Sequence, residues 1–475
     1  MNRAPIRGIL LFRGLLATAV IGLAPVASVY GAPAEPAVRT ASTAAGVSVL
    51  YVSTAGRDAN PGTLAKPLRT LQRAARIVVP GSTVYVRAGK YDGFTLTRSG
   101  LAGKPITIRS YPGERAVISG DSGRTNVVAL KGVHHITLSR LTVQDGRVRQ
   151  GSGILVQRSR NVTVSHSVLL RNHSFGVLVE ESISVIVRDN SISHNATGVR
   201  VRYGGEGVVI HSNRIFNNDR MTVNDSQPGN DTGVQGIAFE KTSGGAVARD
   251  NRIWGNRAKS LDWGEDGAAF EIFGSSNVVI TQNRVWNNRA VLETGTNILY
   301  ACVNNRFTRN VAWRSTSKTS VGLVLRCAKN GLVAHNTFDG LTWWAMQLSH
   351  KSGSFGASIG GLTVVNNIVY GIKSFHINTS LPDTVVLDYN LVWAPDKHVA
   401  YVAGQGYTYR LSQFRSWTGY EDRGISAAPR FVDGARHNYE LRGTSPAIDR
   451  GKRGVLSSGY YGPAPDLGRY EYRPG

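Results

Sequence analysis

The sequence predicts an all-β solenoid, a parallel β-helix, because two columns of similar short segments recur along the chain with a common period. The first column consists of apolar runs that mostly end in a polar or charged residue, at 153–157, 176–180, 198–202, 236–240, 267–271, 290–293 and 322–326. The second consists of asparagines that each begin a β-rich triplet: Asn190, Asn213, Asn251, Asn283, Asn310, Asn336, Asn367 and Asn390. The step from Glu180 to Arg202, like that from Glu271 to Glu293, is 22 residues. A coil of that length accommodates three short strands, as in a parallel β-helix.

Alternation within the first column assigns each side chain to a face, because successive side chains of a strand point to opposite sides. The residues predicted to point into the core are Val156, Val179, Val201, Phe239, Phe270, Leu292 and Leu325. Their successors then point outward: Gln157, Glu180, Arg202, Glu240, Glu271, Glu293 and Arg326. A second outward row is Leu155, Leu178, Arg200, Ala238, Ala269, Val291 and Val324, which leaves only alanine beside Glu240 and Glu271. Strands about 4.8 Å apart would make Glu240, Glu271 and Glu293 a ladder.

The asparagine column has its own physical reason. Asparagine tolerates the left-handed turn conformation better than most residues. Stacked side-chain amides can also hydrogen-bond to one another from coil to coil. We therefore expect Asn213, Asn251 and Asn283 to stack on neighbouring coils.

Both ends of the solenoid depart from the repeat. In the stretch 68–79, apolar residues fall at helical spacing, which predicts an amphipathic helix that covers the first open coil. The stretch 401–475 predicts an irregular C-terminal cap packed on the last coils, with a short helix at 411–417. Residues 49–400 are then one β-helix with its N-terminal cap, and we expect no second catalytic domain.

The N-terminal residues 1–31 are typical of an export signal. Three arginines precede the apolar stretch 15–29, and small residues follow it. The stretch is short for a membrane span, and no other segment qualifies. Residues 32–48 are interpreted as a flexible leader. We therefore expect a secreted, extracellular protein without a membrane span, and a monomer.

The two cysteines, Cys302 and Cys327, suit an exported chain. They fall on neighbouring coils, so an oxidising compartment allows a disulfide between them. The alternative is a pair of buried thiols. Two cysteines without a close histidine pair do not favour a zinc site.

The charge of the chain is strongly positive. Its 55 Lys and Arg residues exceed its 31 Asp and Glu residues, a formal net charge of +24. Such an excess favours a polyanionic partner and carries no information about the fold. Nucleic acid is not the expected partner, because the sequence has no helix-turn-helix, zinc-finger or RNA-binding signature and the chain is predicted to be exported.

Several local motifs resemble one group of proteins. They are Tyr51-Val52-Ser53 with the turn 58–63, the asparagine column, and the closing segments 445–449 and 466–471. Together with the export signal, these motifs resemble secreted bacterial right-handed parallel β-helix proteins, a group similar to polysaccharide lyases and some glycoside hydrolases. The resemblance covers nearly all of the mature chain and implies a right-handed coil. The paired-aspartate motif of the polygalacturonase-type hydrolases is missing, and Glu265-Asp266-Gly267 only partly matches the aspartate cluster of the calcium pectate lyases.

Two insertions lie beside the coils that carry the glutamates. The stretches 217–232 and 259–266 are rich in aspartate, and the second contains Trp263. Loops on one side of a solenoid often build the wall of a binding groove, although ordinary loop variation would give the same pattern. Asp262 and Asp266 in the second insertion are the next catalytic candidates after the glutamates.

The predicted active groove is lined by Glu240, Glu271 and Glu293. One chemistry for such a ladder is glycoside hydrolysis, in which one carboxyl donates a proton and another stays charged. Arg202 and Arg326 would bound the ladder and compensate its charge. Glu271 would be the most perturbed member, because a like charge lies on each side of it.

The second chemistry is β-elimination on a uronic-acid polymer, which the positive charge favours slightly. There Ca²⁺ or an arginine neutralises the substrate carboxylate, and a basic side chain removes the adjacent proton. Glu240, Glu271 and Asp266 are the candidate Ca²⁺ ligands, and the candidate neutralisers and bases are Arg326, Lys241, His350 and Lys351. The predicted substrate-binding residues are Arg200, Arg202, Lys241, Trp263, His350 and Lys351.

A third class is a non-catalytic glycan-binding solenoid. It predicts neither elimination nor hydrolysis, and the glutamates would then form a structural ladder compensated by arginines. The sequence leaves these three classes open.

Overall fold

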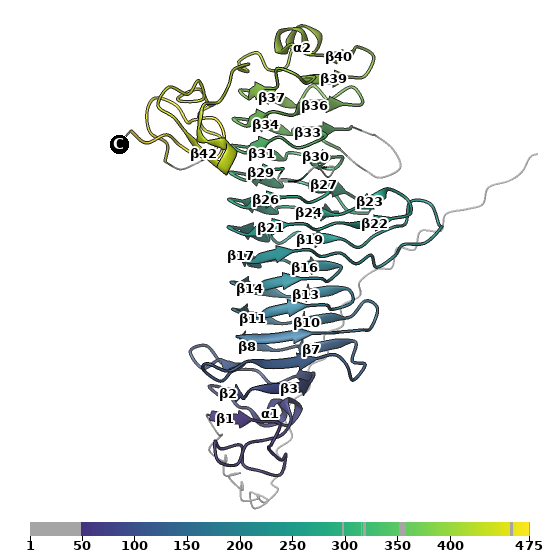
Figure 1. The fold of residues 1–475 in the computed structure, drawn as a ribbon, viewed down its shortest axis with the longest axis vertical. Helices are drawn as coiled ribbons and strands as arrows, with labels where there is room; N and C mark the ends of the chain where they lie inside the picture. Colours follow the sequence, from purple (N-terminus) through teal and green to yellow (C-terminus); the bar gives the residue numbers. More distant parts are fainter. Residues whose placement is uncertain are drawn as a thin grey trace, which may run out of the picture. The chain divides into compact units, whose positions relative to one another are not determined.

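The computed structural model describes residues 49–296, 299–314, 316, 320–350, 358–456 and 459–474, which belong to one compact unit. Three long sheets account for most of its strands, and successive coils contribute one strand to each sheet (Figure 1). Within these three sheets, all neighbouring strands pair in parallel except the last two of one sheet. The predicted parallel β-helix is therefore confirmed. The predicted leader lies outside the described residues.

The strands of each sheet follow one another coil by coil. Sheet A consists of β1 (Val49–Val52), β2 (Thr83–Val86), β5 (Ile106–Ser110), β8 (His134–Ser139), β11 (Arg160–Ser165), β14 (Ile183–Arg188), β17 (Val209–His211), β20 (Val247–Arg249), β25 (Val279–Thr281), β28 (Arg306–Thr308), β31 (Leu332–Ala334), β34 (Thr363–Val365) and β37 (Val386–Asp388). Sheet B consists of β3 (Gly89–Asp92), β6 (Ala116–Ser119), β9 (Leu141–Gln144), β12 (Val168–Leu170), β15 (Ser191–Ser193), β18 (Arg214–Phe216), β21 (Arg252–Trp254), β26 (Arg284–Trp286), β29 (Val311–Trp313), β32 (Thr337–Asp339), β35 (Ile368–Tyr370) and β38 (Leu391–Trp393). Sheet C consists of β4 (Phe94–Leu96), β7 (Asn126–Lys131), β10 (Ser152–Gln157), β13 (Phe175–Glu180), β16 (Thr197–Arg202), β19 (Gln235–Glu240), β24 (Ala268–Phe273), β27 (Ala290–Gly295), β30 (Val321–Leu325), β33 (Trp344–Leu348), β36 (Lys373–Ile377), β39 (Ala400–Val402) and β40 (Gly406–Thr408).

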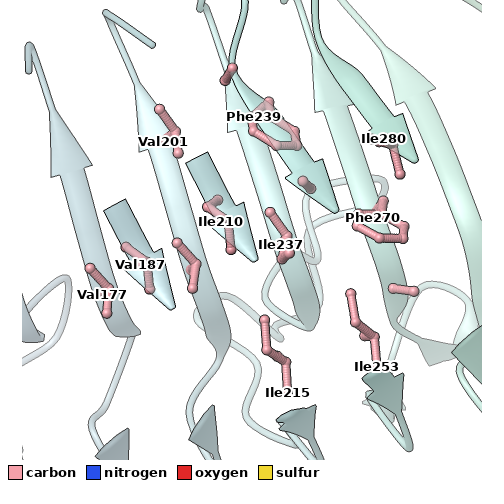
Figure 2. Packing of buried hydrophobic residues seen from close by; sticks show 14 of the residues in the cluster. Val177, Val187, Val201, Ile210, Ile215, Ile237, Phe239, Ile253, Phe270 and Ile280 are labelled. Carbon is pink, nitrogen blue, oxygen red and sulfur yellow. The ribbon is translucent and has the colours of Figure 1, made fainter. Parts of the chain in front are cut away.

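The core fills the space between the three sheets. Figure 2 shows Val177, Ile237 and Phe270 of sheet C among side chains from the other two sheets. The residues predicted to point inward are all buried, with at most 2% of any of them exposed: Val156, Val179, Val201, Phe239, Phe270, Leu292 and Leu325. Complete burial of each such side chain contributes about 1.5–3 kcal/mol, so the apolar column dominates the stability of the coils.

The asparagine column is also confirmed. Each side-chain amide donates to the amide oxygen of the next coil, for example from Asn213 to Asn251 and from Asn251 to Asn283, at 3.0 Å. The series ends at buried Glu421, whose carboxylate accepts from the backbone and the side chain of Asn390. The left-handed residue, however, is the one before each asparagine, such as Asp250 (φ 56°) before Asn251. That residue makes the turn, and the asparagine after it is free to turn its amide inward.

Two α-helices border the coils, and both differ slightly from their predicted ranges. Helix α1 (Leu71–Ile77) is shorter than 68–79, because Thr70 caps its first turn by accepting from the Arg73 amide. Its apolar residues are buried against β1 and β4. Helix α2 (Leu411–Thr418) extends one residue beyond 411–417 and ends at left-handed Gly419. Its Phe414 stacks on Phe375 of β36, with ring centroids 5.5 Å apart.

The chain after α2 returns to the outward face of sheet B. It contains β41 (Phe431–Asp433), the short 3₁₀ helix η1 (Gly434–Arg436) and β42 (Asn438–Leu441). Tyr439 and Leu467 pack with Trp313 in a separate apolar cluster. The Tyr439 hydroxyl also donates to Asp339 at 2.7 Å. No helix in the described part of the chain is long and apolar enough to cross a membrane.

Candidate active site

The outward face of sheet C brings two of the three predicted glutamates into one column. In the register of β24 and β27, Glu271 lies directly opposite Glu293. On the other side, Glu271 lies opposite Ala238 of β19. We call the series Arg200, Ala238, Glu271, Glu293 and Val324 the Glu271 column.

Glu240 belongs to the next outward column, so the predicted three-membered ladder is wrong. It lies opposite Arg202 of β16 and Phe273 of β24. Its carboxylate contacts the Arg200 guanidinium at 3.3 Å and the Lys241 ammonium at 3.8 Å. Arg202 does not compensate Glu240, because its Nε donates to Glu180 at 2.6 Å. Glu240 is therefore an ion-paired neighbour of the Glu271 column.

The two-residue difference arises where the second insertion enters β24. The sequence pattern aligned Gly267 with Gly236, but Ile237 pairs with Phe270, which places Ala269 beside Gly236. Gly267 instead ends the hairpin with φ 143°, close to the backbone of Asn256, where a side chain would collide. A glycine is required there for the insertion and does not mark the start of the coil.

The alanines near the glutamates also differ from their predicted places. Ala238 lies in the outward Glu271 column as expected, whereas Ala269 is buried in the core. Its neighbour Ala268 joins Ala290, Val321 and Val324 in a small apolar cluster separate from the core. The Glu271 column is thus flanked by small apolar side chains, as the prediction required, but by different ones.

Burial and like charges perturb the two stacked glutamates. Burial, together with the charges of Asp266 and Glu240, raises the pKa of Glu271, and Arg200 opposes this rise. Burial, Asp266 and Glu271 raise the pKa of Glu293 to about 7, against Arg326 and Arg289. The pKa values of both glutamates are thus raised, and that of Glu293 is near neutral. That Glu271 is the more perturbed of the two stays a prediction.

The carboxylates of Glu271 and Glu293 differ from that of Glu240 in their contacts. Within the described ranges, no hydrogen bond or ion pair involves the side chain of Glu271 or Glu293. Both side chains are partly buried. A partly buried carboxyl with a near-neutral pKa and no partner is suited to gaining and losing a proton.

The insertion hairpin contributes a third perturbed carboxyl. Strand β22 (Ala258–Ser260) pairs with β23 (Gly264–Asp266), and Figure 1 shows both beyond β24. Asp266 accepts from the Gly267 amide at 2.8 Å. Burial nevertheless raises the pKa of Asp266, and Arg289 partly offsets this. Its charge in turn acts on Glu271 and Glu293.

Cationic side chains surround the pair. The Arg200 guanidinium donates to Gln235 at 3.3 Å and lies over the Phe175 ring, while its buried Nε has no partner in the described part of the chain. Arg289 was missed by the sequence analysis, although it immediately precedes β27 and could have been found there. Arg326 is exposed beside the disulfide that joins Cys302 and Cys327. Lys241 lies over the rings of Tyr203 and Tyr300.

The remaining predicted residues are not brought to the pair. Trp263 is 59% exposed at the turn of the hairpin. Asp262 accepts from the Asp231 amide, and Asp231 accepts in return from the Asp262 amide, so these aspartates join the two insertions to each other. The backbone of His350 is bonded to Thr379, with no contact to either glutamate. Lys351 lies outside the described residues.

The predicted Ca²⁺ ligands do not form a metal site in this arrangement. Across the described residues, no three His, Cys, Asp or Glu side chains are grouped so that they could hold a metal ion. Glu240 is turned toward Arg200 and Lys241, one column away from Glu271. We therefore derive no chemical step through Ca²⁺, and its binding stays a prediction.

More than half of the chain matches a known family of β-helix proteins. The family model described as "Pel9A-like, right handed beta helix region" matches residues 50–299, which is more than half of the 475 residues. The chain belongs to this family. The predicted right-handed parallel β-helix and its likeness to polysaccharide-processing β-helix proteins are thereby confirmed.

Two curated proteins are similar to parts of the chain. It is 37% identical over 134 residues to the uncharacterized protein YwoF of Bacillus subtilis, covering 27% of this chain and 29% of YwoF. It is 27% identical over 219 residues to pectate lyase PEL9 of Emericella nidulans, covering 45% of this chain and 48% of PEL9. The chain thus spans less than half the length of either relative. Among solved structures, XylC in a complex with xylose shares the fold, with a TM-score of 0.54 and 12% identity over 73% of this chain and 83% of XylC.

Proposed function

We propose that the protein is an extracellular enzyme that cleaves an acidic polysaccharide on the outward face of sheet C, with Glu271 and Glu293 as the pair that exchanges the proton. The observation that carries this proposal is the stacked pair of glutamates, which have no hydrogen-bond or ion-pair partner among the described residues and one of which has a pKa of about 7. The formal charge of +24 supports an acidic polymer as substrate, because the protein attracts polyanions. Family membership and the partial similarity to a pectate lyase support a glycan over nucleic acid.

The geometry supports glycoside hydrolysis as one reaction at this pair. A carboxyl with a near-neutral pKa is protonated in much of the enzyme at neutral pH, so Glu293 can donate a proton to the oxygen of the leaving sugar. Glu271 then supplies the second carboxylate. Adjacent strands lie about 4.8 Å apart, which is close to the roughly 5–5.5 Å between the carboxyl groups of retaining glycosidases.

Two observations support β-elimination as the second candidate. One is the similarity to pectate lyase PEL9. The other is the group of cations near the pair, where Arg200, Arg289 and Arg326 act electrostatically on the two glutamates. In this reaction a guanidinium would neutralise the uronate carboxylate, and the ionised form of Glu293 would remove the adjacent proton. A C=C bond then forms as the C–O bond to the leaving sugar breaks, and that sugar oxygen takes up a proton from solvent. Bound Ca²⁺, where present, would supply the same neutralisation.

A substrate screen tests the function and separates the two reactions. The purified protein is incubated with polygalacturonate, alginate and neutral xylan, with Ca²⁺ or with EDTA. Ultraviolet absorbance of an unsaturated product indicates elimination, and new reducing ends without that absorbance indicate hydrolysis. Activity that disappears with EDTA and returns with Ca²⁺ would support the metal-dependent form of elimination. Binding of a polysaccharide without either product would indicate the third class, a non-catalytic glycan-binding solenoid.

The variant Glu271→Gln tests the site on the substrate that the screen identifies. We expect a loss of about 10²-fold or more in kcat/KM, equivalent to roughly 3 kcal/mol of transition-state stabilisation. Glu440→Gln is the matched control, because Glu440 is exposed on β42, which belongs to a separate two-stranded sheet and not to sheet C. Full activity of Glu271→Gln would show that the glutamate pair is not catalytic, and Asp266 would then be the next catalytic candidate.

A further inference from the structure

The Glu271 column continues well beyond the two glutamates. From Glu293 it passes through Val324 and Gln347 to His376 of β36. It then reaches Tyr401 of β39 and Tyr407 of β40, the last strand of sheet C. Figure 1 shows these strands one above another from β27 to β40. Five strand spacings separate Glu293 from Tyr407, a distance of about 24 Å.

Aromatic side chains gather at the far end of this column. We call Trp343, Trp344, His376, Tyr401, Tyr407 and Tyr409 the aromatic platform. Trp344 stacks on His376 with centroids 5.0 Å apart and an angle of 8° between the rings. Tyr401 contacts both His376 and Tyr407 with centroids 4.9 Å away. His398 lies between Tyr407 and Tyr409, 4.6 and 4.2 Å from their rings.

The outer members of the aromatic platform are unusually exposed for large rings. The exposed fractions are 46% for Trp343, 57% for Tyr407 and 60% for Tyr409. Contiguous exposed aromatic surface on a soluble protein commonly marks a binding site. Lys373 adds a cation, with its ammonium 5.3 Å from the ring centres of both Trp343 and Trp344.

We propose that the aromatic platform binds a distal part of the same acidic polysaccharide that the glutamate pair cleaves, so that the chain lies along the Glu271 column over several sugar residues. This inference rests on the proposed function for its cleavage site but not for its binding surface. The faces of sugar rings are apolar and pack on aromatic rings, and Lys373 can pair with a uronate carboxylate. Continuity with the glutamates in one straight column favours a linear polymer over a folded partner.

Binding measurements on an inactivated protein test the platform directly. In the Glu271→Gln background, titration calorimetry with polygalacturonate and with digalacturonate compares a ligand that can reach the platform with one too short to span the column. Adding Tyr407→Ala should weaken polygalacturonate binding about tenfold, within the range that one well-packed aromatic contact contributes. The same Tyr407→Ala change should weaken the binding of digalacturonate, measured under the same conditions, by much less.

Tyr461→Ala is the matched control for the loss of an exposed tyrosine. Tyr461 is 52% exposed but belongs to the C-terminal segment. Its replacement should leave polymer binding unchanged. Equal losses in the two variants, no loss in either, or no polygalacturonate binding at all would overturn the proposal.

The outcome is separable from that of the proposed function. A selective loss in Tyr407→Ala supports the aromatic platform even if the wild-type protein cleaves none of the polymers. Cleavage by the wild-type protein with unchanged binding in Tyr407→Ala supports the function and removes the platform. A second variant, Trp343→Ala, should reproduce the Tyr407→Ala result, and a normal circular dichroism spectrum for each variant excludes unfolding as the cause.

Discussion

Glu271 and Glu293 lie opposite each other on β24 and β27, one strand spacing apart, and neither has a partner in the described part of the chain. Glu240 shares their face but is paired with Arg200 and Lys241. Two adjacent carboxyls cannot both ionise easily in a partly buried position, so one tends to keep a proton near neutral pH. The pair is therefore able to act as an acid and a base, whereas Glu240 has a charge-balancing role.

The direction in which activity changes with pH should reveal the role of Glu293. In hydrolysis Glu293 must be protonated, so kcat/KM should fall as the pH rises through about 7. In elimination it must be ionised, so kcat/KM should instead rise through the same value. A pH–rate profile on the identified substrate measures this change in kcat/KM around pH 7, which we call the Glu293 limb of the profile. A profile that is flat around neutral pH would contradict both roles.

The same raised pKa predicts a pH-dependent effect on stability. Folding raises the pKa of Glu293 from 4.5 to about 7, so the folded state holds the proton more tightly. The stability that this provides is complete at low pH and is lost as the pH rises through about 7. Glu293→Gln removes the ionisation, so it should stabilise the protein relative to wild type by roughly 1–3 kcal/mol at about pH 9 and much less at about pH 5.

Thermal unfolding at the two pH values measures that difference. Glu440→Gln again serves as the control, because Glu440 is exposed on β42. A difference between Glu293→Gln and wild type that is the same at both pH values would show that Glu293 is not perturbed in the folded protein.

Sequence periodicity predicted the coils because the same physical requirement recurs in each of them. Every coil must bury an apolar residue such as Val201 or Phe239 and must satisfy a buried turn through an amide such as that of Asn251. Each requirement therefore places the same type of residue at the same position of every coil, so the apolar column and the asparagine column recur with the same period. Most of the fold was accessible in this way.

The register of β24 could not be predicted from the sequence, because the end of the second insertion has the same residue pattern as the start of a coil strand. Gly267 has the place in the sequence of a coil glycine such as Gly236, yet it directly follows β23 and ends the hairpin. The resulting shift was two residues, and a shift of two keeps Glu271 on the outward face while moving it to another column. Glu271 was consequently predicted on the correct face but in the wrong column. Asp266 of the hairpin acts electrostatically on both glutamates, and Arg289, which precedes β27, acts on Glu293. Periodicity does not report either interaction.

The asparagine column should contribute strongly to stability at single positions. Asn251 accepts from the backbone and side chain of Asn213 and donates to Asn283 and to the Ile210 carbonyl. Asn251→Ala would leave several buried donors and acceptors without partners, each of which costs about 1–3 kcal/mol. We expect a loss of about 3 kcal/mol or more in the free energy of unfolding.

Chemical denaturation of Asn251→Ala, with Asn224→Ala as control, measures this loss. Asn224 is exposed in the first insertion, where its side-chain amide donates to the Lys259 carbonyl and accepts from the Leu261 amide of the second insertion. Its replacement should cost less than about 1 kcal/mol. Similar losses in the two variants would show that the buried column does not carry the stability assigned to it.

The disulfide between Cys302 and Cys327 connects stability to the site, because it fixes the segment that carries Arg326. The bond spans a sequence separation of 25, for which chain-entropy arguments give a stabilisation of about 3 kcal/mol. Thiol titration of the unfolded, unreduced protein should find no free thiol, and reduction should lower the midpoint of thermal unfolding. Reduction should also raise the apparent pKa of the Glu293 limb in the pH–rate profile, because Arg326 opposes the rise in the pKa of Glu293 and would no longer be held near it. Two free thiols, or a midpoint that does not respond to reduction, would contradict this prediction.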